Sequence, residues 1–343
     1  MKKYFPKIFG NTDTKMRLSD AIIDKTLPHA ILIVGPHGSG KSTLATEIAA
    51  SANCLNQDSE NHDLPCGICN NCKRIYSGNF PDISFLEKTS SKATIGVEEL
   101  REFREDMFLS PTESAYKFYV IKDADIMTAA AQNALLKVLE EPPKSVHILL
   151  LASEADKILS TIKSRTQYIQ TELFDYEKLY SYVTALSSTA EGLIRTDSDK
   201  LKALLLSSGG VIGKALEVLE GKEIENIASK RNLIKDFVSV FPKKTPFSKV
   251  YSAAMALPTK REELKSVLEG TLNALRDMIT YCMCETVSPI FFLNTDEIDN
   301  ALAGISKKRL LAIYDIITSA LEDIDKNVVV SSLLTDVAIK MRS

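Results

Sequence analysis

The 343-residue sequence lacks the features that mark several classes of protein. No apolar run approaches the ~18 residues of a membrane-spanning helix. The start of the chain has two lysines but no apolar stretch behind them, so we expect no signal peptide. Internal repeats and low-complexity tracts are missing as well, and a formal net charge of only −3 excludes an overall attraction to nucleic acid. We expect a cytoplasmic globular protein.

Hydrophobic residues make up 45% of the chain, which is enough to bury the cores of two or three domains. Up to residue 172, short apolar runs alternate with helix-length segments, which predicts an α/β domain with a parallel sheet; the runs are 30–35, 83–87, 117–122 and 147–152. Beyond it the apolar residues have helical spacing. We therefore expect a small helical domain over 173–222 and a larger helical bundle over 223–343.

One of the apolar runs leads directly into a glycine-rich segment and then into a helical pattern, TLATEIAA. This context is typical of a phosphate loop (P-loop), in which backbone N–H groups and the helix N-terminus surround phosphates. Lys41 would contact the β- and γ-phosphates of ATP, and Ser42 would ligate Mg²⁺. The alternative is a glycine-rich turn without a ligand, which the flanking strand and helix disfavour. The candidate residues are Gly35, Gly38, Ser39, Gly40, Lys41, Ser42 and Thr43.

Four of the six cysteines lie close together in the sequence: Cys54, Cys66, Cys69 and Cys72. Two-residue spacers allow thiolates to converge on one tetrahedral Zn²⁺, and a site closed by four thiolates is structural. His62, in the loop between them, is a spare candidate ligand, and chance clustering of unliganded thiols is the alternative. The remaining pair, Cys282 and Cys284, lies in a helical pattern, and we expect ordinary helix packing there.

Further motifs follow these two in an order that resembles the bacterial DNA polymerase III clamp-loader family of AAA+ proteins. Residues 77–82 are similar to a family stretch that follows the zinc module, and residues 133–143, NALLKVLEEPP, are close to its most recognisable run. Residues 164–167 resemble the family's S-R-C motif, with threonine in place of cysteine. The resemblance covers 1–172 densely and the helical remainder only by pattern.

The resemblance implies a subunit with a P-loop domain, a helical lid (173–222) and a helical collar (223–343). Such subunits form a hetero-pentamer with delta and gamma/tau subunits inside the DNA polymerase III holoenzyme. The pentamer uses ATP to place a sliding clamp on primer–template DNA during replication. Each S-R-C arginine reaches the nucleotide of a neighbouring subunit, and Arg165 matches that arginine finger. A planar, permanently charged guanidinium suits this role, although a surface arginine in a loop is the plainer alternative.

The sequence departs from the family's motor subunits, which end a strand in Asp-Glu to hold Mg²⁺ and orient water. One alignment places Lys122 and Asp123 at these positions, and a slip of one residue places Asp123 and Ala124 there. Either register weakens hydrolysis, so Asp123 is a degenerate Walker B residue.

Two further positions bear on hydrolysis. Motor subunits carry an arginine in the lid where this chain has Gly213, and the adjacent Lys214 is an imperfect substitute. Ser153, in contrast, falls where the family has a polar residue that senses the γ-phosphate.

The combined pattern favours the delta-prime type of subunit, which donates a finger and has weak or absent ATPase activity of its own. The alternative within the family is a gamma/tau-type motor, and the need for Lys41 in ATP turnover would distinguish the two. A stand-alone P-loop kinase would leave the cysteine cluster and Arg165 unexplained. Nucleotide binding would separate all of these from a purely structural zinc-and-helix scaffold.

Overall fold

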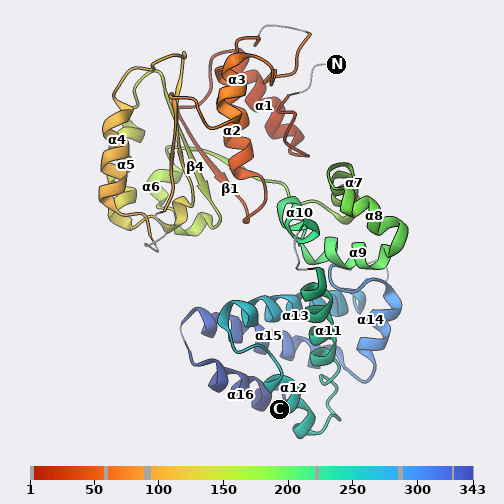
Figure 1. The fold of residues 1–343 in the computed structure, drawn as a ribbon. Helices are drawn as coiled ribbons and strands as arrows, with labels where there is room; N and C mark the ends of the chain where they lie inside the picture. Colours follow the sequence, from red (N-terminus) through yellow and green to blue (C-terminus); the bar gives the residue numbers. More distant parts are fainter. Residues whose placement is uncertain are drawn as a thin grey trace. The chain divides into compact units, whose positions relative to one another are not determined.

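The computed structural model of the protein describes residues 4–57, 61–88, 94–220, 224–284, 289–326 and 328–342. The chain divides into two units (Figure 1). The first consists of Met1–Phe174 together with Val211–Lys214, and the second of Asp175–Gly210 and Ala215–Ser343. The expected separation of a lid over 173–222 from a collar over 223–343 stays a prediction.

The first unit is built on a five-stranded parallel sheet, which confirms the α/β prediction. Its strand order is β2-β3-β4-β1-β5, so the first strand lies near the middle. Four strands fall on the predicted apolar runs, and β5 was not predicted. The strands are β1 (Ala30–Val34), β2 (Ile83–Leu86), β3 (Lys117–Ile121), β4 (Val146–Ala152) and β5 (Gln167–Gln170).

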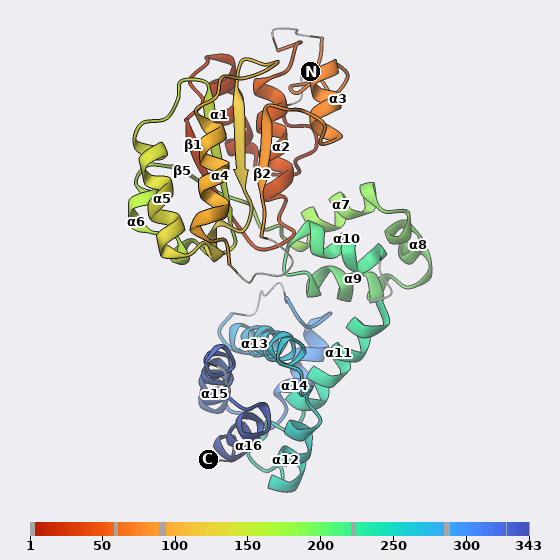
Figure 2. The same ribbon diagram turned by 60° about the vertical axis from the view of Figure 1, so that its left-hand side comes forward.

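Helices cover both faces of this sheet (Figure 2). Alternate residues of β1 belong to different cores: Ile31 and Ile33 face one core and Leu32 faces the other. The first core also includes residues of α1 (Thr12–Ile23), α2 (Lys41–Ala52) and α3 (Asn70–Tyr76). The second includes residues of α4 (Val97–Met107), α5 (Ala129–Glu140) and α6 (Ser160–Lys163). Two short 3₁₀ helices, η1 (Ala124–Ile126) and η2 (Ala155–Lys157), follow β3 and β4.

The described part of the second unit is helical, as the apolar spacing predicted. A single apolar core joins helices α11 to α16, and α13 packs on α15 while α12 packs on α16. The helices after β5 are α7 (Tyr176–Leu186), α8 (Ser188–Thr196), α9 (Ser198–Ser207), α10 (Ile212–Glu220), α11 (Ile224–Val238), α12 (Phe247–Met255), α13 (Arg261–Tyr281), α14 (Thr295–Leu302), α15 (Lys307–Asp325) and α16 (Val330–Lys340).

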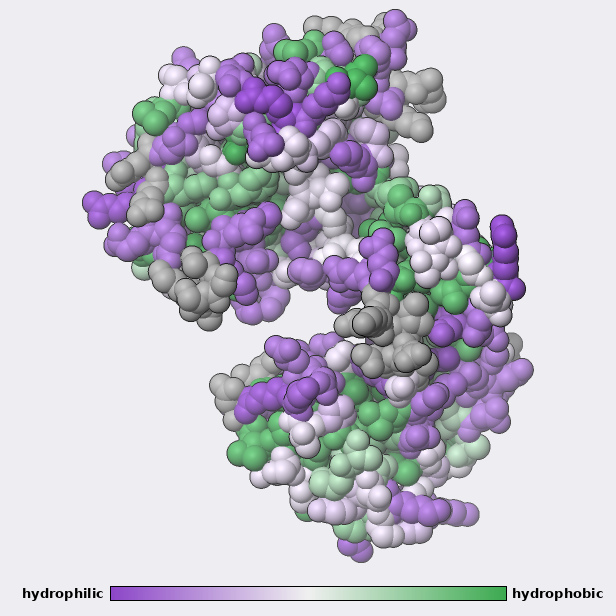
Figure 3. Space-filling view, in the orientation of Figure 1, coloured by the Kyte–Doolittle hydropathy of each residue, from purple (hydrophilic) through white to green (hydrophobic). Residues whose placement is uncertain are grey.

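Hydrophilic residues predominate on the face drawn in Figure 3, and hydrophobic residues form smaller areas among them. Some large apolar side chains are nevertheless exposed, among them Phe108 and Leu109 after α4. Across the described ranges, no helix has both the length and the apolar character needed to span a membrane.

Candidate functional site

The phosphate loop connects β1 to α2, as predicted, and its backbone requires glycine. Gly38 and Gly40 adopt φ angles of +82° and +87°, in the left-handed region that other residues rarely enter. A Cβ atom on Gly35 would lie 1.8 Å from the Thr171 hydroxyl oxygen. That hydroxyl donates to Ser39 Oγ over 2.9 Å and so ties the loop to the end of β5.

Lys41, the first residue of α2, places its ammonium group inside the loop. Its Nζ donates to the carbonyl oxygens of Gly35 (2.6 Å) and Pro36 (3.0 Å) and to Ser153 Oγ (3.4 Å). Burial lowers the pKa of Lys41, and the carboxylates of Asp123 and Asp125 oppose this shift. A cation in a glycine-rich loop at a helix N-terminus fits a polyphosphate, because the ammonium and the helix N-terminus both attract negative charge.

Two carboxylates extend the site beyond the loop, and one of them was not predicted. Asp123 lies two residues after the end of β3, has a φ angle of +50° and is the N-cap residue of η1. Asp125 accepts hydrogen bonds from the backbone N–H groups of Ser153 (3.1 Å) and Glu154 (3.3 Å), and it therefore fixes the end of β4 beside Lys41. Its only sequence signal was an acidic residue shortly after a buried strand.

Lys122 points away from the phosphate loop. Its ammonium forms an ion pair with Glu87 and lies 5.2 Å from the ring centroid of Phe85, both in or next to β2. Asp123, in contrast, is close enough to Lys41 to affect its pKa. Asp123, rather than Lys122, is therefore the residue on the side of the phosphate loop. Its role at a metal position stays a prediction. The next residue is then Ala124, which is buried and has no carboxylate.

The segment Val211–Lys214 packs directly on the phosphate loop within the first unit. The Gly213 N–H donates to the Gly38 carbonyl oxygen over 3.0 Å. A Cβ atom on Gly213 would lie 2.4 Å from that oxygen and 2.9 Å from Gly38 Cα, so this close approach requires glycine. The Lys214 side chain is exposed. Backbone therefore occupies the position at which the resemblance places an arginine in motor subunits.

Arg165 lies in an exposed segment just after α6. Its Nη1 donates to the Thr161 carbonyl oxygen (3.1 Å) and to Ser164 Oγ (3.2 Å), and its Nη2 lies 2.9 Å from Glu140 Oε1. The hydroxyl of Thr166 donates to the Ile162 carbonyl oxygen over 3.1 Å, which caps the same helix end. None of these contacts of Arg165 involves the phosphate loop of its own chain.

The four clustered cysteines converge in space: their sulfur atoms all lie within 4.8 Å of one another. Cys66 Sγ and Cys72 Sγ are 4.0 Å apart. Four thiolates bound to one zinc ion at 2.3 Å would be about 3.8 Å apart, so the group fits a tetrahedral zinc ion. His62 is not part of this group among the described residues.

Backbone and side-chain N–H groups surround the cysteine sulfurs. Cys69 N donates to Cys66 Sγ, Cys72 N to Cys69 Sγ, and Asn56 N to Cys54 Sγ, each over 3.4 Å. A hydrogen bond from Cys72 lowers the pKa of Cys54 to about 5, whereas the same contact and burial raise the pKa of Cys72. One thiolate is therefore already favoured at neutral pH, and N–H donors of this kind support zinc-bound thiolates.

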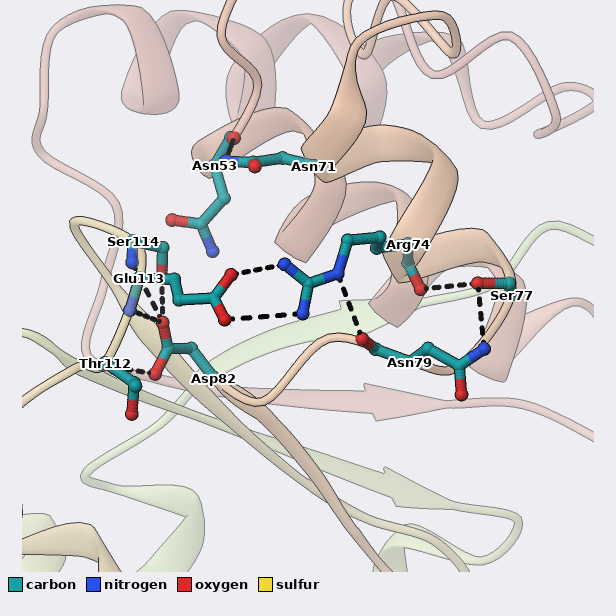
Figure 4. A network of polar contacts seen from close by, with 9 residues as sticks. All are labelled: Asn53, Asn71, Arg74, Ser77, Asn79, Asp82, Thr112, Glu113 and Ser114. Carbon is teal, nitrogen blue, oxygen red and sulfur yellow. Dashed lines mark hydrogen bonds and ion pairs between the residues drawn. The ribbon is translucent and has the colours of Figure 1, made fainter.

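A polar network joins α3, the helix that contains Cys72, to the loop before β3 (Figure 4). Arg74 of α3 forms an ion pair with Glu113, in the loop before β3. The buried Asp82 carboxylate accepts the backbone N–H groups of Thr112 (2.7 Å), Glu113 (2.8 Å) and Ser114 (2.9 Å). These bonds outweigh burial and hold the pKa of Asp82 below its ordinary value. The loop that receives Arg74 is thereby fixed.

The two downstream cysteines do not pack in a helix as predicted. Cys282 follows the last residue of α13, and Cys282 and Cys284 are both exposed. The apolar spacing of α13 continues beyond the point at which the helix ends, which is why the sequence pattern was misleading.

Comparisons with known proteins agree on one family. The family model described as "DNA polymerase III, delta subunit" matches residues 10–174. DNA polymerase III subunit gamma of Buchnera aphidicola (subsp. Acyrthosiphon pisum) is 31% identical over 71% of this chain and 66% of its own length. DNA polymerase III subunit delta′ of Bacillus subtilis is 39% identical over 44% of each chain. The chain thus spans two thirds or less of the length of these relatives.

A crystal structure of a DNA polymerase III gamma subunit-related protein from Thermotoga maritima covers 95% of this chain and 98% of its own. Its TM-score is 0.45 and its sequence identity is 18%. The residues that the family model matches include the phosphate loop, the cysteine cluster and Arg165. The chain belongs to the clamp-loader AAA+ family of DNA polymerase III subunits.

Proposed function

We propose that this chain is a delta-prime-like subunit of the DNA polymerase III clamp loader. In this role it donates Arg165 to the ATP site of a neighbouring subunit and helps to place the sliding clamp on primer–template DNA. The observation that carries the proposal is the exposure of Arg165, whose contacts are Thr161, Ser164 and Glu140 rather than its own phosphate loop. An arginine directed away from its own site is available to another subunit.

The chain's own site is expected to bind nucleotide and to hydrolyse it slowly. Lys41 and the glycine amides would hold the phosphates, and Asp123 would hold Mg²⁺. ATP bound there supplies a γ-phosphate with which Lys41 and Ser153 can interact. Ala124 has no group to orient an attacking water, and Gly213 has no side chain to reach the phosphate. Two contributions to transition-state stabilisation are therefore missing.

Zinc is expected to have a structural role in the same subunit. Cys54, Cys66, Cys69 and Cys72 supply four thiolates and leave no position open for water. Through Arg74 and Glu113, the module is connected to the loop that precedes β3. It would stabilise this part of the α/β domain rather than take part in nucleotide chemistry.

A gamma/tau-type motor is the second candidate, and specific observations favour it. The phosphate loop is intact, and Asp123, Asp125 and Ser153 all lie near Lys41. The gamma subunit of Buchnera aphidicola also matches a larger share of this chain than the delta′ subunit of Bacillus subtilis does. Under this alternative, Lys41 itself would be required for ATP turnover.

The test is ATP turnover by the clamp loader reconstituted with delta and gamma/tau subunits, stimulated by the sliding clamp and primed DNA. Loaders with wild-type protein, Arg165→Ala, Lys41→Ala and Arg101→Ala are compared. Arg101 is an exposed arginine of α4 in the same unit and serves as the matched control. Arginine fingers contribute about 10³–10⁵ in rate in other P-loop enzymes, so we expect Arg165→Ala to lower turnover severalfold or more.

Arg101→Ala and Lys41→Ala should leave turnover near the wild-type value, and the isolated protein should show little turnover. A severe loss with Lys41→Ala would instead identify a motor. A loader unaffected by Arg165→Ala would contradict the finger assignment.

A further inference from the structure

Among the described residues, Glu140 is the one outside the turn 161–165 that makes a polar contact with the Arg165 guanidinium. It is the last residue of α5, and its Oε1 lies 2.9 Å from Arg165 Nη2. The two contacts made by Nη1, with Thr161 and Ser164, both lie within the chain turn that carries Arg165. The contact with Glu140 therefore connects the guanidinium to α5.

The position of Glu140 is not explained by helix stability. A helix C-terminus carries partial negative charge, so a glutamate there is unfavourable, whereas Lys137 in the same turn is favourable. Nor does the ion pair add much stability, since both partners are partly exposed and such pairs contribute little. What the contact does provide is a point at the end of α5 that holds one end of the guanidinium of a long side chain.

Hydrogen bonds connect α5, which carries Glu140, to the chain before α6. Gln132 of α5 is buried, and its side chain accepts from Leu159 N over 2.8 Å and donates to the Lys157 carbonyl oxygen over 3.0 Å. These bonds fasten α5 to the segment that leads into α6. α5, which ends at Glu140, is thus hydrogen-bonded to the segment that leads into α6 and Arg165.

We propose that Glu140 is a positioning residue for the arginine finger. This inference rests on the proposed function, because it assigns a role to the contact only if Arg165 acts on a neighbouring subunit. By engaging Nη2, Glu140 restricts the rotamers of Arg165 and leaves other N–H donors of the guanidinium for the phosphate. A finger that is already oriented loses less freedom when it reaches its target, which lowers the barrier of the neighbour's reaction.

The experiment uses the reconstituted loader and compares Glu140→Ala, Glu140→Gln, Glu141→Ala, Arg165→Ala and the double variant Glu140→Ala/Arg165→Ala. Glu141 is the matched control, since it is the adjacent exposed glutamate at the same helix end. Both kcat and KM for ATP are measured, together with the unfolding midpoint of each isolated variant.

Glu140→Ala should lower kcat roughly three- to tenfold with KM unchanged, less than the ~100-fold loss that a misplacement of 1 Å can cause. Glu140→Gln should keep most of the activity, because its amide oxygen still accepts from the guanidinium. In the Arg165→Ala background the Glu140 change should have no further effect, which is the mark of a shared function. Glu141→Ala should match the wild type, and all unfolding midpoints should agree.

The roles of Arg165 and of Glu140 would be overturned by different results. If Arg165→Ala leaves turnover unchanged, the finger assignment itself is wrong. If Arg165→Ala lowers turnover but Glu140→Ala does not, or if the two losses simply add, only the positioning role of Glu140 is overturned. A higher kcat in Glu140→Ala would also overturn it, because it would identify the carboxylate as a competitor of the phosphate.

Discussion

Gly213 offers a direct test of the contact between residues 211–214 and the phosphate loop. It lies in α10, where replacing glycine by alanine ordinarily favours the helix. Here, however, the new methyl group would lie 2.4 Å from the Gly38 carbonyl oxygen and 2.9 Å from Gly38 Cα. These are backbone atoms, which cannot rotate away as the end of a side chain can. Either the loop or the segment must move.

The magnitudes decide the sign of the effect. Alanine in place of glycine gains at most about 1 kcal/mol of helix propensity. Overpacking costs about 1–3 kcal/mol, and losing the Gly213–Gly38 hydrogen bond costs roughly 1 kcal/mol more. We therefore expect Gly213→Ala to lower the free energy of unfolding by about 1–3 kcal/mol after the propensity gain is subtracted.

Gly192 supplies the control for this prediction. It lies within α8, and no atom comes within 4 Å of a Cβ built on it, so Gly192→Ala should raise the free energy of unfolding by up to about 1 kcal/mol. Urea unfolding measures both variants, and hydrogen exchange should become faster across residues 36–43 in Gly213→Ala alone. Equal stabilisation by both substitutions would refute the packing of Gly213 on the phosphate loop.

The metal site and the polar network give two more predictions. Cys72→Ser should reduce bound zinc well below about one ion per chain and lower the unfolding midpoint, whereas Cys284→Ser should change neither. Elemental analysis and thermal unfolding test this. Retention of zinc by Cys72→Ser would contradict the site. Asp82→Asn should lower the free energy of unfolding by on the order of 3 kcal/mol, because its amide group would oppose backbone N–H donors. Since the pKa of Asp82 is depressed in the folded state, its stabilisation is full above about pH 4 and is lost as the pH falls through the folded pKa. Urea titrations at several pH values should show a shallower acid-side loss in Asp82→Asn, and an unchanged pH dependence would argue against the network.

The α/β fold was predictable because its central strands are buried on both faces. A strand with no polar face appears in the sequence as a continuous apolar run, as in β1 and β4. The strand β5 escaped prediction for the opposite reason. It pairs with β1 alone at the edge of the sheet, and of its four residues only Ile169 is buried. A short edge strand with polar neighbours gives no hydropathy signal.

The candidate site was predictable where its residues are close in sequence. The phosphate loop and the cysteine cluster are local patterns whose chemistry fixes their spacing. The direction of the Lys122 side chain was not predictable, because the sequence does not show that Glu87 lies beside it in the fold. The contact of Gly213 with Gly38 joins distant segments, and in the sequence it appeared only as a missing arginine.

These observations indicate where the chemistry of this subunit should be measured. Its phosphate loop keeps Lys41, whereas under the proposed function Ala124 and Gly213 lack the groups that would orient water and reach the phosphate. Arg165 is exposed, and none of its described contacts involves the phosphate loop of its own chain. A group that stabilises a transition state contributes only where that transition state forms. Under the proposed function, turnover by the isolated chain therefore reports the activity of its own site alone. The contribution of Arg165 would be measurable only when a neighbouring nucleotide site is present.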